Sequence, residues 1–160
     1  MNTSPIRNTL ILQSLVLLGG TIFAWSNFLP LVSHFYALYG TLARVAGCTI
    51  PNPFLTPCFY GSFAFLVALL WSVSIYERPS LVQERRLRNF LLLCVVFAGS
   101  VVAYEAAQYY KIISDAVSVS CTPGASPFKT SCFYGTFIFI AAYIAAIVAT
   151  RRLSTSDTVA

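Results

Sequence analysis

Four of the five cysteines in this chain stand in two pairs, and their type and spacing make them the residues best suited to chemistry. Nine residues separate Cys48 from Cys58, and ten separate Cys121 from Cys132. Two cysteines at such spacing can form a permanent disulfide or exchange a disulfide with a partner thiol. Both segments read Cys-Thr, then a proline-containing bend, and then Pro-Phe-x-Thr-x-Cys-Phe-Tyr-Gly. We interpret them as two copies of one bend.

Four cysteines allow three pairings. We expect the bonds Cys48–Cys58 and Cys121–Cys132, because a duplicated unit needs a solution that works twice. Each bond would hold the exit of one helix against the entry of the next and would stabilise the fold by about 2–4 kcal/mol. Disulfide exchange is the alternative, because Cys58 and Cys132 lie at helix N-termini, where unpaired N–H groups stabilise a thiolate. The Cys-x-x-Cys spacing usual for catalytic dithiols is absent from both bends, which favours structural bonds.

The remaining residues of the bends suggest helix entries. Thr56 and Thr130 each stand two residues before a cysteine and are expected to be N-caps of the helices that follow. Gly61 and Gly135 fall in the first turn, where a missing side chain lets another helix come close. The fifth cysteine, Cys94, lies in an apolar segment and is expected to be an inert buried thiol.

A second candidate site consists of polar residues in an apolar segment: Glu105, Gln108 and, in the equivalent segment of the first copy, His34. An ionisable residue within a membrane span is costly and indicates function by default. Aligning the two bends places Glu105 at nearly the depth of His34, the only histidine, so we expect these two to pair. Tyr36 and Tyr39 are neutral alternatives as donors. The competing interpretation is that Glu105 reaches the outer headgroup layer and only anchors its helix.

Composition sets the class of the protein. Hydrophobic residues make up 58% of the chain and charged residues 9%, with a mean hydropathy of +0.75. A soluble domain carries roughly a quarter charged residues, so a multi-pass protein in the lipid bilayer is expected. The net charge of +5 comes from basic residues at helix ends rather than on one face, which argues against a nucleic-acid partner. Copies of the chain or other membrane subunits are the expected partners.

The apolar runs predict an all-α membrane protein with four transmembrane helices in one domain, 1–160. The expected spans are 9–29, 59–76, 89–110 and 133–150, each long enough to cross a bilayer. Pro30 is expected to kink the first helix, which continues to Val45, and the third helix continues towards Val117. We prefer a retained first helix to a cleaved signal peptide. The repeats, about 9–78 and 89–152, predict a parallel duplication about a pseudo-twofold axis along the membrane normal. The tail, 153–160, is expected to be disordered.

Basic residues predict the orientation. Three lie on the side of the bends, and the other seven lie on the side of the termini and of the link between the two copies: Arg7, Arg78, Arg85, Arg86, Arg88, Arg151 and Arg152. The side with more Arg and Lys is cytoplasmic by the positive-inside rule. We therefore expect both termini in the cytoplasm and both bends on the extracytoplasmic side, where disulfides persist.

This layout resembles that of the quinone-coupled disulfide-forming membrane proteins. Four spans, cytoplasmic termini and two cysteine pairs on the outer side carry the resemblance, which implies a quinone cofactor and thiol–disulfide exchange. The Cys-x-x-Cys of that family is absent here, so none of its catalytic roles is carried over to a residue of this chain.

Three classes of function remain. The first is a non-enzymatic, disulfide-stapled structural or assembly subunit without a cofactor, which requires no motif that the chain lacks. The second is a thiol–disulfide oxidoreductase that uses a membrane quinone and the bend cysteines: Cys58, Cys132, Cys48 and Cys121. The third is a small transporter or channel subunit with Glu105 and His34 in its pathway. No metal site is expected, because one histidine and five acidic residues cannot supply a conventional ligand set.

Overall fold

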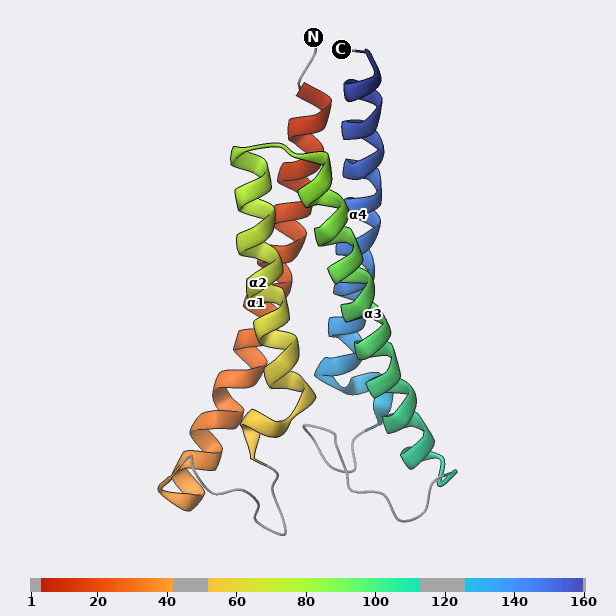
Figure 1. Ribbon diagram of the computed structural model, residues 1–160. Helices are drawn as coiled ribbons and strands as arrows, with labels where there is room; N and C mark the ends of the chain where they lie inside the picture. Colours follow the sequence, from red (N-terminus) through yellow and green to blue (C-terminus); the bar gives the residue numbers. More distant parts are fainter. Residues whose placement is uncertain (1–3, 42–51, 113–125, 160) are drawn as a thin grey trace.

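The computed structural model describes residues 4–41, 52–112 and 126–159, and within these ranges it is helical and contains no strand (Figure 1). The four long helices are α1 (Ser4–Tyr39), α2 (Pro57–Glu77), α3 (Leu81–Tyr109) and α4 (Ser131–Val159). Each is long and apolar enough to cross a membrane. The predicted helical class and the four apolar helices are therefore confirmed.

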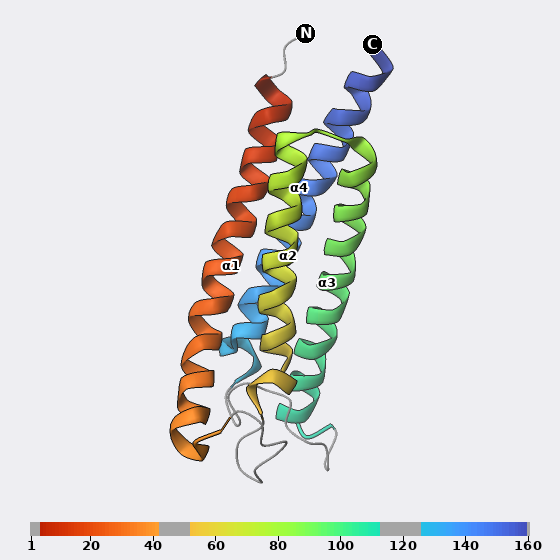
Figure 2. The ribbon, with the colours of Figure 1, turned by 60° about the vertical axis from the view of Figure 1, so that its left-hand side comes forward.

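The four helices form a bundle in which α1 and α3 occupy diagonal positions (Figure 2). Both of these helices pack against α2 and α4, but in the described residues no Cα atom of α1 lies within 8 Å of one in α3. The two termini and the α2–α3 connection lie at one end of the bundle, here called the terminal end (Figure 1). The helix entries that follow the two cysteine bends lie at the other end, here called the bend end.

Small residues and aromatic rings form the interior between α2 and α4. Phe65 and Phe139 stack in parallel, with ring centroids 3.8 Å apart and an interplanar angle of 5°. Ala68 on α2 and Ala142 on α4 are fully buried in the same cluster. A Cβ atom at Gly20 would lie 2.5 Å from the Phe65 ring. Gly20 therefore lets α1 approach this pair of helices closely.

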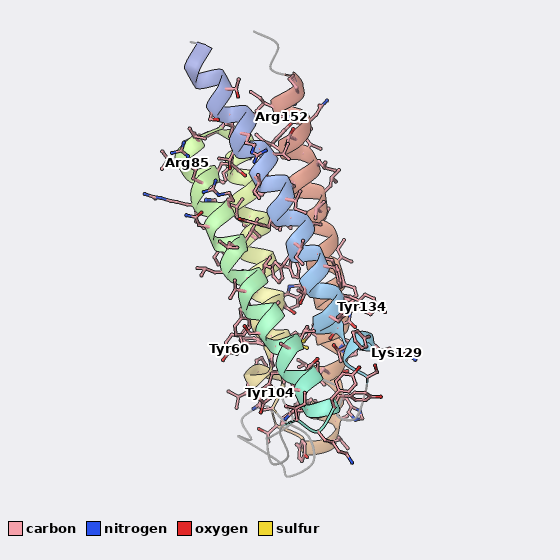
Figure 3. The ribbon with its side chains drawn as sticks, turned by 90° about the vertical axis from the view of Figure 1, so that its right-hand side faces the viewer. Tyr60, Arg85, Tyr104, Lys129, Tyr134 and Arg152 are labelled. Carbon is pink, nitrogen blue, oxygen red and sulfur yellow. The ribbon has the colours of Figure 1, made fainter. Side chains whose placement is uncertain are left out.

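Arginines secure the terminal end. Arg152 donates hydrogen bonds to the Pro5 carbonyl oxygen, at 2.7 Å, and to the Thr9 hydroxyl, which ties α4 to α1. Arg7 donates to the Tyr76 hydroxyl at 2.8 Å and ties α1 to α2. Figure 3 shows Arg85 and Arg152 towards this end and Lys129 towards the bend end.

The helix boundaries differ from the prediction most at four helix ends. The first helix continues through Pro30, as expected, but it ends at Tyr39, because Gly40 adopts a positive φ of 65°, which terminates helices. The third helix begins at Leu81 instead of residue 89 and includes Arg85, Arg86 and Arg88 of the link. It ends at Tyr109, and residues 113–117 of its expected extension lie outside the described residues.

The fourth difference concerns the C-terminal tail. Disorder was expected after residue 152, whereas α4 is helical up to Val159. Arg152 holds this part of the helix against α1, and Leu153 is buried. Packing against the first helix therefore extends α4 beyond the apolar run that predicted it.

Candidate functional site

The two bends enter their helices through the same local structure. A single 3₁₀ turn, η1 (Pro53–Leu55) or η2 (Pro127–Lys129), is followed by one threonine and then by α2 or α4. Each turn begins with proline, whose fixed φ suits the first helical position and whose missing N–H is not needed there. The repeated Pro-Phe-x-Thr sequence therefore produces the same turn twice.

The two threonines differ in what their hydroxyl groups do. Thr130 Oγ1 accepts a hydrogen bond from the backbone N–H of Phe133 at 3.4 Å, as expected of an N-cap. Thr56 occupies the N-cap position of α2 but makes no side-chain capping bond. Its Oγ1 donates to the Pro53 carbonyl oxygen at 2.6 Å. The predicted capping bond is thus present only in the second bend.

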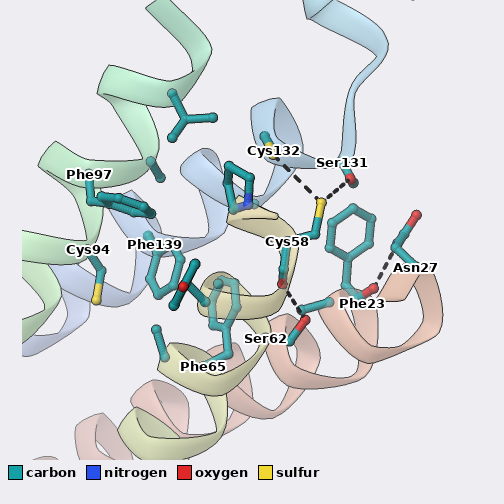
Figure 4. Close-up of a pocket in the computed structure, with 18 of the residues that line it drawn as sticks. Phe23, Asn27, Cys58, Ser62, Phe65, Cys94, Phe97, Ser131, Cys132 and Phe139 are labelled. Carbon is teal, nitrogen blue, oxygen red and sulfur yellow. Dashed lines mark hydrogen bonds between the residues drawn. The ribbon is translucent and has the colours of Figure 1, made fainter. Parts of the chain in front are cut away.

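Cys58 and Cys132 face each other across the bundle axis at the bend end (Figure 4). Each is the second residue of its helix, and their sulfur atoms are 3.9 Å apart. A covalent S–S bond is roughly 2.05 Å long, so these two sulfurs are in contact without being bonded to each other. Ser131 Oγ lies 3.6 Å from the Cys58 sulfur. This contact was not predicted, because each cysteine was expected to bond within its own bend.

The expected disulfides are not shown by the structure. Cys48 and Cys121 lie outside the described residues, and Cys132 is a free thiol in the structure. Both pairings within the bends therefore stay predictions. Cys94 is a half-buried free thiol, as expected.

A pocket of about 410 Å³ adjoins the two sulfurs. Its wall is largely apolar and comes from all four helices, with both sulfurs at one side (Figure 4). The aromatic part of the wall consists of Phe23, Tyr60, Phe65, Phe90, Phe97 and Phe139. Asn27, Ser62 and Ser131 contribute polar groups, and Cys94 also lies on the wall. This arrangement suits a flat apolar ligand that is held by rings and reaches the sulfurs.

Two glycines of the bends also line the pocket. A Cβ atom at Gly61 or at Gly135 would meet no atom within 4 Å. The expected close approach of another helix at these glycines is therefore wrong. Their missing side chains leave space that belongs to the pocket, and the close approach occurs at Gly20 instead.

Glu105 has a different partner from the one that we expected. It is 5% exposed, and its Oε2 accepts a hydrogen bond from Thr130 Oγ1 at 3.0 Å. Its Oε1 has no partner among the described residues. His34 is exposed on α1, the helix diagonal to α3, so the expected pairing of Glu105 with His34 is wrong. Gln108 is half-buried one turn further along α3.

A second buried polar pair, Gln13 and Glu84, was missed in the sequence analysis. Both side chains are fully buried towards the terminal end, where Gln13 of α1 faces Glu84 of α3. None of their four side-chain oxygen and nitrogen atoms has a hydrogen-bond partner of good geometry among the described residues. The signal was present in helical spacing: once α3 starts after Ser80, Glu84 falls on one face with Leu87 and Leu91.

Comparison of the chain with protein-family models, with curated proteins and with solved structures finds no match. The described residues also contain no group of three or more His, Cys, Asp or Glu side chains placed to hold a metal ion. The function of the site therefore has to be inferred from the two sulfurs, the pocket beside them and the carboxyl group on α3.

Proposed function

We propose that the protein is a membrane thiol–disulfide exchange protein whose two bends pass a disulfide from one to the other. The observation that carries this proposal is the 3.9 Å contact between the sulfurs of Cys58 and Cys132. A structural bond within each bend does not require the sulfurs of different bends to meet. Exchange requires such a meeting, because a thiolate must reach the sulfur that it attacks.

The exchange starts from the bond predicted between Cys48 and Cys58. The Cys132 thiolate forms a bond to the Cys58 sulfur, the Cys48–Cys58 bond breaks, and its electron pair leaves on Cys48. The Cys121 thiolate then attacks Cys132, which forms the Cys121–Cys132 bond and releases Cys58 as a thiolate. One disulfide breaks and one forms overall, so atoms and electrons balance. The disulfide has moved to the second bend.

The pocket supports a lipid-soluble quinone as the electron acceptor. A protein dithiol on the outer side reduces one bend disulfide and becomes a disulfide itself. The reduced bend then gives two electrons and two protons to the quinone, which becomes a quinol, and its disulfide forms again. The pocket has a volume of about 410 Å³ and borders both sulfurs, and its aromatic rings can stack on a planar ligand.

Contacts between α2 and α4 support the proposed duplication. Cys58 and Cys132 stand 74 positions apart, and the stacked Phe65 and Phe139 stand at the same offset. Residues near a twofold axis meet their own equivalents, so an axis between α2 and α4 would produce both pairs.

The proposed topology places the bend end outside and the terminal end in the cytoplasm. The arginines at the terminal end support it through the positive-inside rule, and the outer side is where disulfides persist. A cysteine introduced by Arg86→Cys should resist a membrane-impermeant maleimide added outside intact cells and react after permeabilisation. Labelling from outside without permeabilisation would reverse the topology.

Peptide mapping under non-reducing conditions tests the exchange. Full-length protein in lipid nanodiscs is equilibrated at graded ratios of reduced to oxidised glutathione and is quenched with acid and an alkylating reagent. We expect a Cys58–Cys132 peptide at intermediate ratios, and we expect it to accumulate in Cys121→Ser, which cannot complete the second step. Cys94→Ser is the matched control and should leave the pattern unchanged.

The same experiment separates exchange from the non-enzymatic alternative. A stapled structural or assembly subunit would show only the bonds within each bend at every ratio, including a persistent Cys48–Cys58 bond in Cys121→Ser. The quinone is tested by reduction of a short-chain ubiquinone analogue with dithiothreitol as the donor. We expect turnover that is lost in Cys58→Ser and Cys132→Ser and retained in Cys94→Ser. No described contact favours the transporter alternative, because Glu105 and His34 do not meet.

A further inference from the structure

The second bend contacts a buried carboxyl group, that of Glu105 on α3, which the exchange described above does not use. Glu105 accepts a hydrogen bond from Thr130 through Oε2, and its Oε1 has no partner in the described part of the chain. Thr130 directly precedes α4, and Cys132 is the second residue of that helix. Thr130 Oγ1 also accepts a hydrogen bond from the backbone N–H of Phe133, the residue after Cys132. The carboxyl group is therefore fixed to the turn that presents this sulfur.

The first bend shows that the turn can be built without a carboxyl group. There the same Pro-Phe-x-Thr sequence folds with the Thr56 hydroxyl donating to the Pro53 carbonyl oxygen. A carboxylate buried with one unpartnered oxygen costs free energy in a membrane protein. Since the first bend avoids this cost, the structure of the turn alone does not explain Glu105.

We infer that Glu105 is the proton acceptor for the Cys132 thiol, an inference that rests on the proposed exchange function. The thiolate is the nucleophile in exchange, so the proton on Cys132 must leave before the attack on Cys58. It passes to Glu105 Oε1, directly or through one water molecule, and the electron pair of the S–H bond stays on sulfur. When the Cys121–Cys132 bond is later reduced and Cys132 leaves as a thiolate, the protonated Glu105 returns the proton.

Charge explains why a carboxylate suits this task. Before transfer, the pair consists of a carboxylate and a neutral thiol; afterwards, it consists of a carboxylic acid and a thiolate. The site carries one negative charge in both states, so proton transfer does not add a second charge to a poorly solvated place. The N–H groups at the start of α4 then face the thiolate and stabilise it. In the first bend, the Thr56 hydroxyl donates to the Pro53 carbonyl oxygen and has no carboxyl partner among the described residues.

The test measures the alkylation rate of Cys132 by N-ethylmaleimide in full-length Cys58→Ser protein in nanodiscs. The protein is first reduced with dithiothreitol, which is then removed, so that the predicted Cys121–Cys132 bond is open and Cys132 cannot exchange with Cys58. We expect Glu105→Gln to slow alkylation on the order of a hundredfold, the lower end of a general base's usual contribution. The opposite result has a clear physical meaning. If Glu105 only repels the thiolate, its removal favours the thiolate and alkylation becomes faster. An unchanged or faster rate overturns the inference.

Two further variants protect the test against misfolding. Glu105→Asp keeps the carboxyl group and should retain a rate between those of the parent and Glu105→Gln. Glu77→Gln removes an exposed carboxylate at the other end of α2 and should not change the rate. Equal slowing by Glu105→Asp and Glu105→Gln would indicate damage to the fold and overturn the inference.

The role of Glu105 and the proposed exchange can be refuted separately. Slow alkylation in Glu105→Gln together with an absence of any Cys58–Cys132 peptide would keep the acid–base pair and refute exchange. A trapped Cys58–Cys132 peptide with an unchanged alkylation rate would keep exchange and refute the role of Glu105.

Discussion

The two bends share a sequence but not a set of contacts. The first bend closes on itself: Asn52 Oδ1 caps η1 by accepting from the Phe54 N–H at 3.0 Å, and the Thr56 hydroxyl bonds back to Pro53. The second bend has no side-chain capping bond at Ser126, and its Thr130 hydroxyl reaches out to Glu105 on α3.

Aromatic packing follows the same division. Phe54 of the first bend is half-buried and packs edge-on against Phe28 and Phe59. Its counterpart in the second bend, Phe128, is 53% exposed and contacts Phe133. The first copy is therefore held by packing and local hydrogen bonds, whereas the second is held through a carboxyl group. The two copies therefore form the same 3₁₀ turn, but in the described part of the chain only the second contacts a buried carboxyl group.

The largest expected difference lies in the aromatic packing. Phe28 is 3% exposed and contacts the rings of Trp25, Phe54 and Phe59, so Phe28→Ala should lower the free energy of unfolding by about 3 kcal/mol. Phe128→Ala should lower it by less than about 1 kcal/mol, because the ring is mostly exposed. Reversible unfolding in mixed micelles with rising sodium dodecyl sulfate measures both. Equal losses would contradict the stronger aromatic packing around the first bend.

The two threonines should differ by a smaller amount in their contribution to the free energy of unfolding. Thr130→Val removes the hydroxyl donor that Glu105 has among the described residues, which should cost about 2 kcal/mol, because an ionisable group loses its donor. Thr56→Val removes a bond to a carbonyl oxygen and should cost about 1 kcal/mol. The same unfolding assay compares them. A larger loss in Thr56→Val would contradict the assignment of the carboxyl contact to the second bend.

Alanine substitutions at the equivalent glycines of the two copies should both raise stability, in contrast to the losses expected above. Gly61→Ala and Gly135→Ala place a methyl group in open space, so each should raise stability by about 0.5–1 kcal/mol through helix propensity. Each also narrows the pocket and should weaken turnover of the ubiquinone analogue. Gly20→Ala is the contrasting control, since its methyl group would meet the Phe65 ring. Unchanged quinone turnover in both bend variants would place the quinone elsewhere.

The smallest expected effect concerns Ser131. Its hydroxyl lies 3.6 Å from the Cys58 sulfur, and the corresponding residue of the first bend is Pro57, which has no hydroxyl to offer Cys132. Ser131→Ala should slow the release of Cys58 from a Cys58–Cys132 bond by about threefold, the size of one weak hydrogen bond. Quenched-flow peptide mapping of Cys121–Cys132 formation measures this rate, and an accelerated release would assign the hydroxyl a different role.

Helical class and number were predictable, because apolar runs of membrane-spanning length leave the backbone few other ways to form its hydrogen bonds. Helix ends were less predictable. The third helix begins early because Leu87 and Leu91 are buried from its first turns, and α4 extends because Arg152 binds α1. Both effects depend on neighbouring helices, which a single apolar run does not reveal.

The candidate site was predictable in its residues but not in its contacts. Aligning the bends gave the depth of Glu105 correctly enough to suggest a partner, but depth does not tell which helices are neighbours. His34 was at a suitable depth on the diagonal helix, whereas Thr130 was on an adjacent one. The contact of Cys58 with Cys132 could have been found from the predicted twofold axis, because equivalent residues on helices beside an axis meet each other.

The buried pair of Gln13 and Glu84 has a consequence for the order of assembly. Glu84 lies one turn into α3, close to Arg85, Arg86 and Arg88, so a newly inserted α3 can keep it at the water boundary. It loses this hydration only when the other helices pack around it. The cost of its dehydration therefore belongs to helix association and not to insertion. Glu84→Leu should leave insertion unchanged and let the inserted helices associate faster.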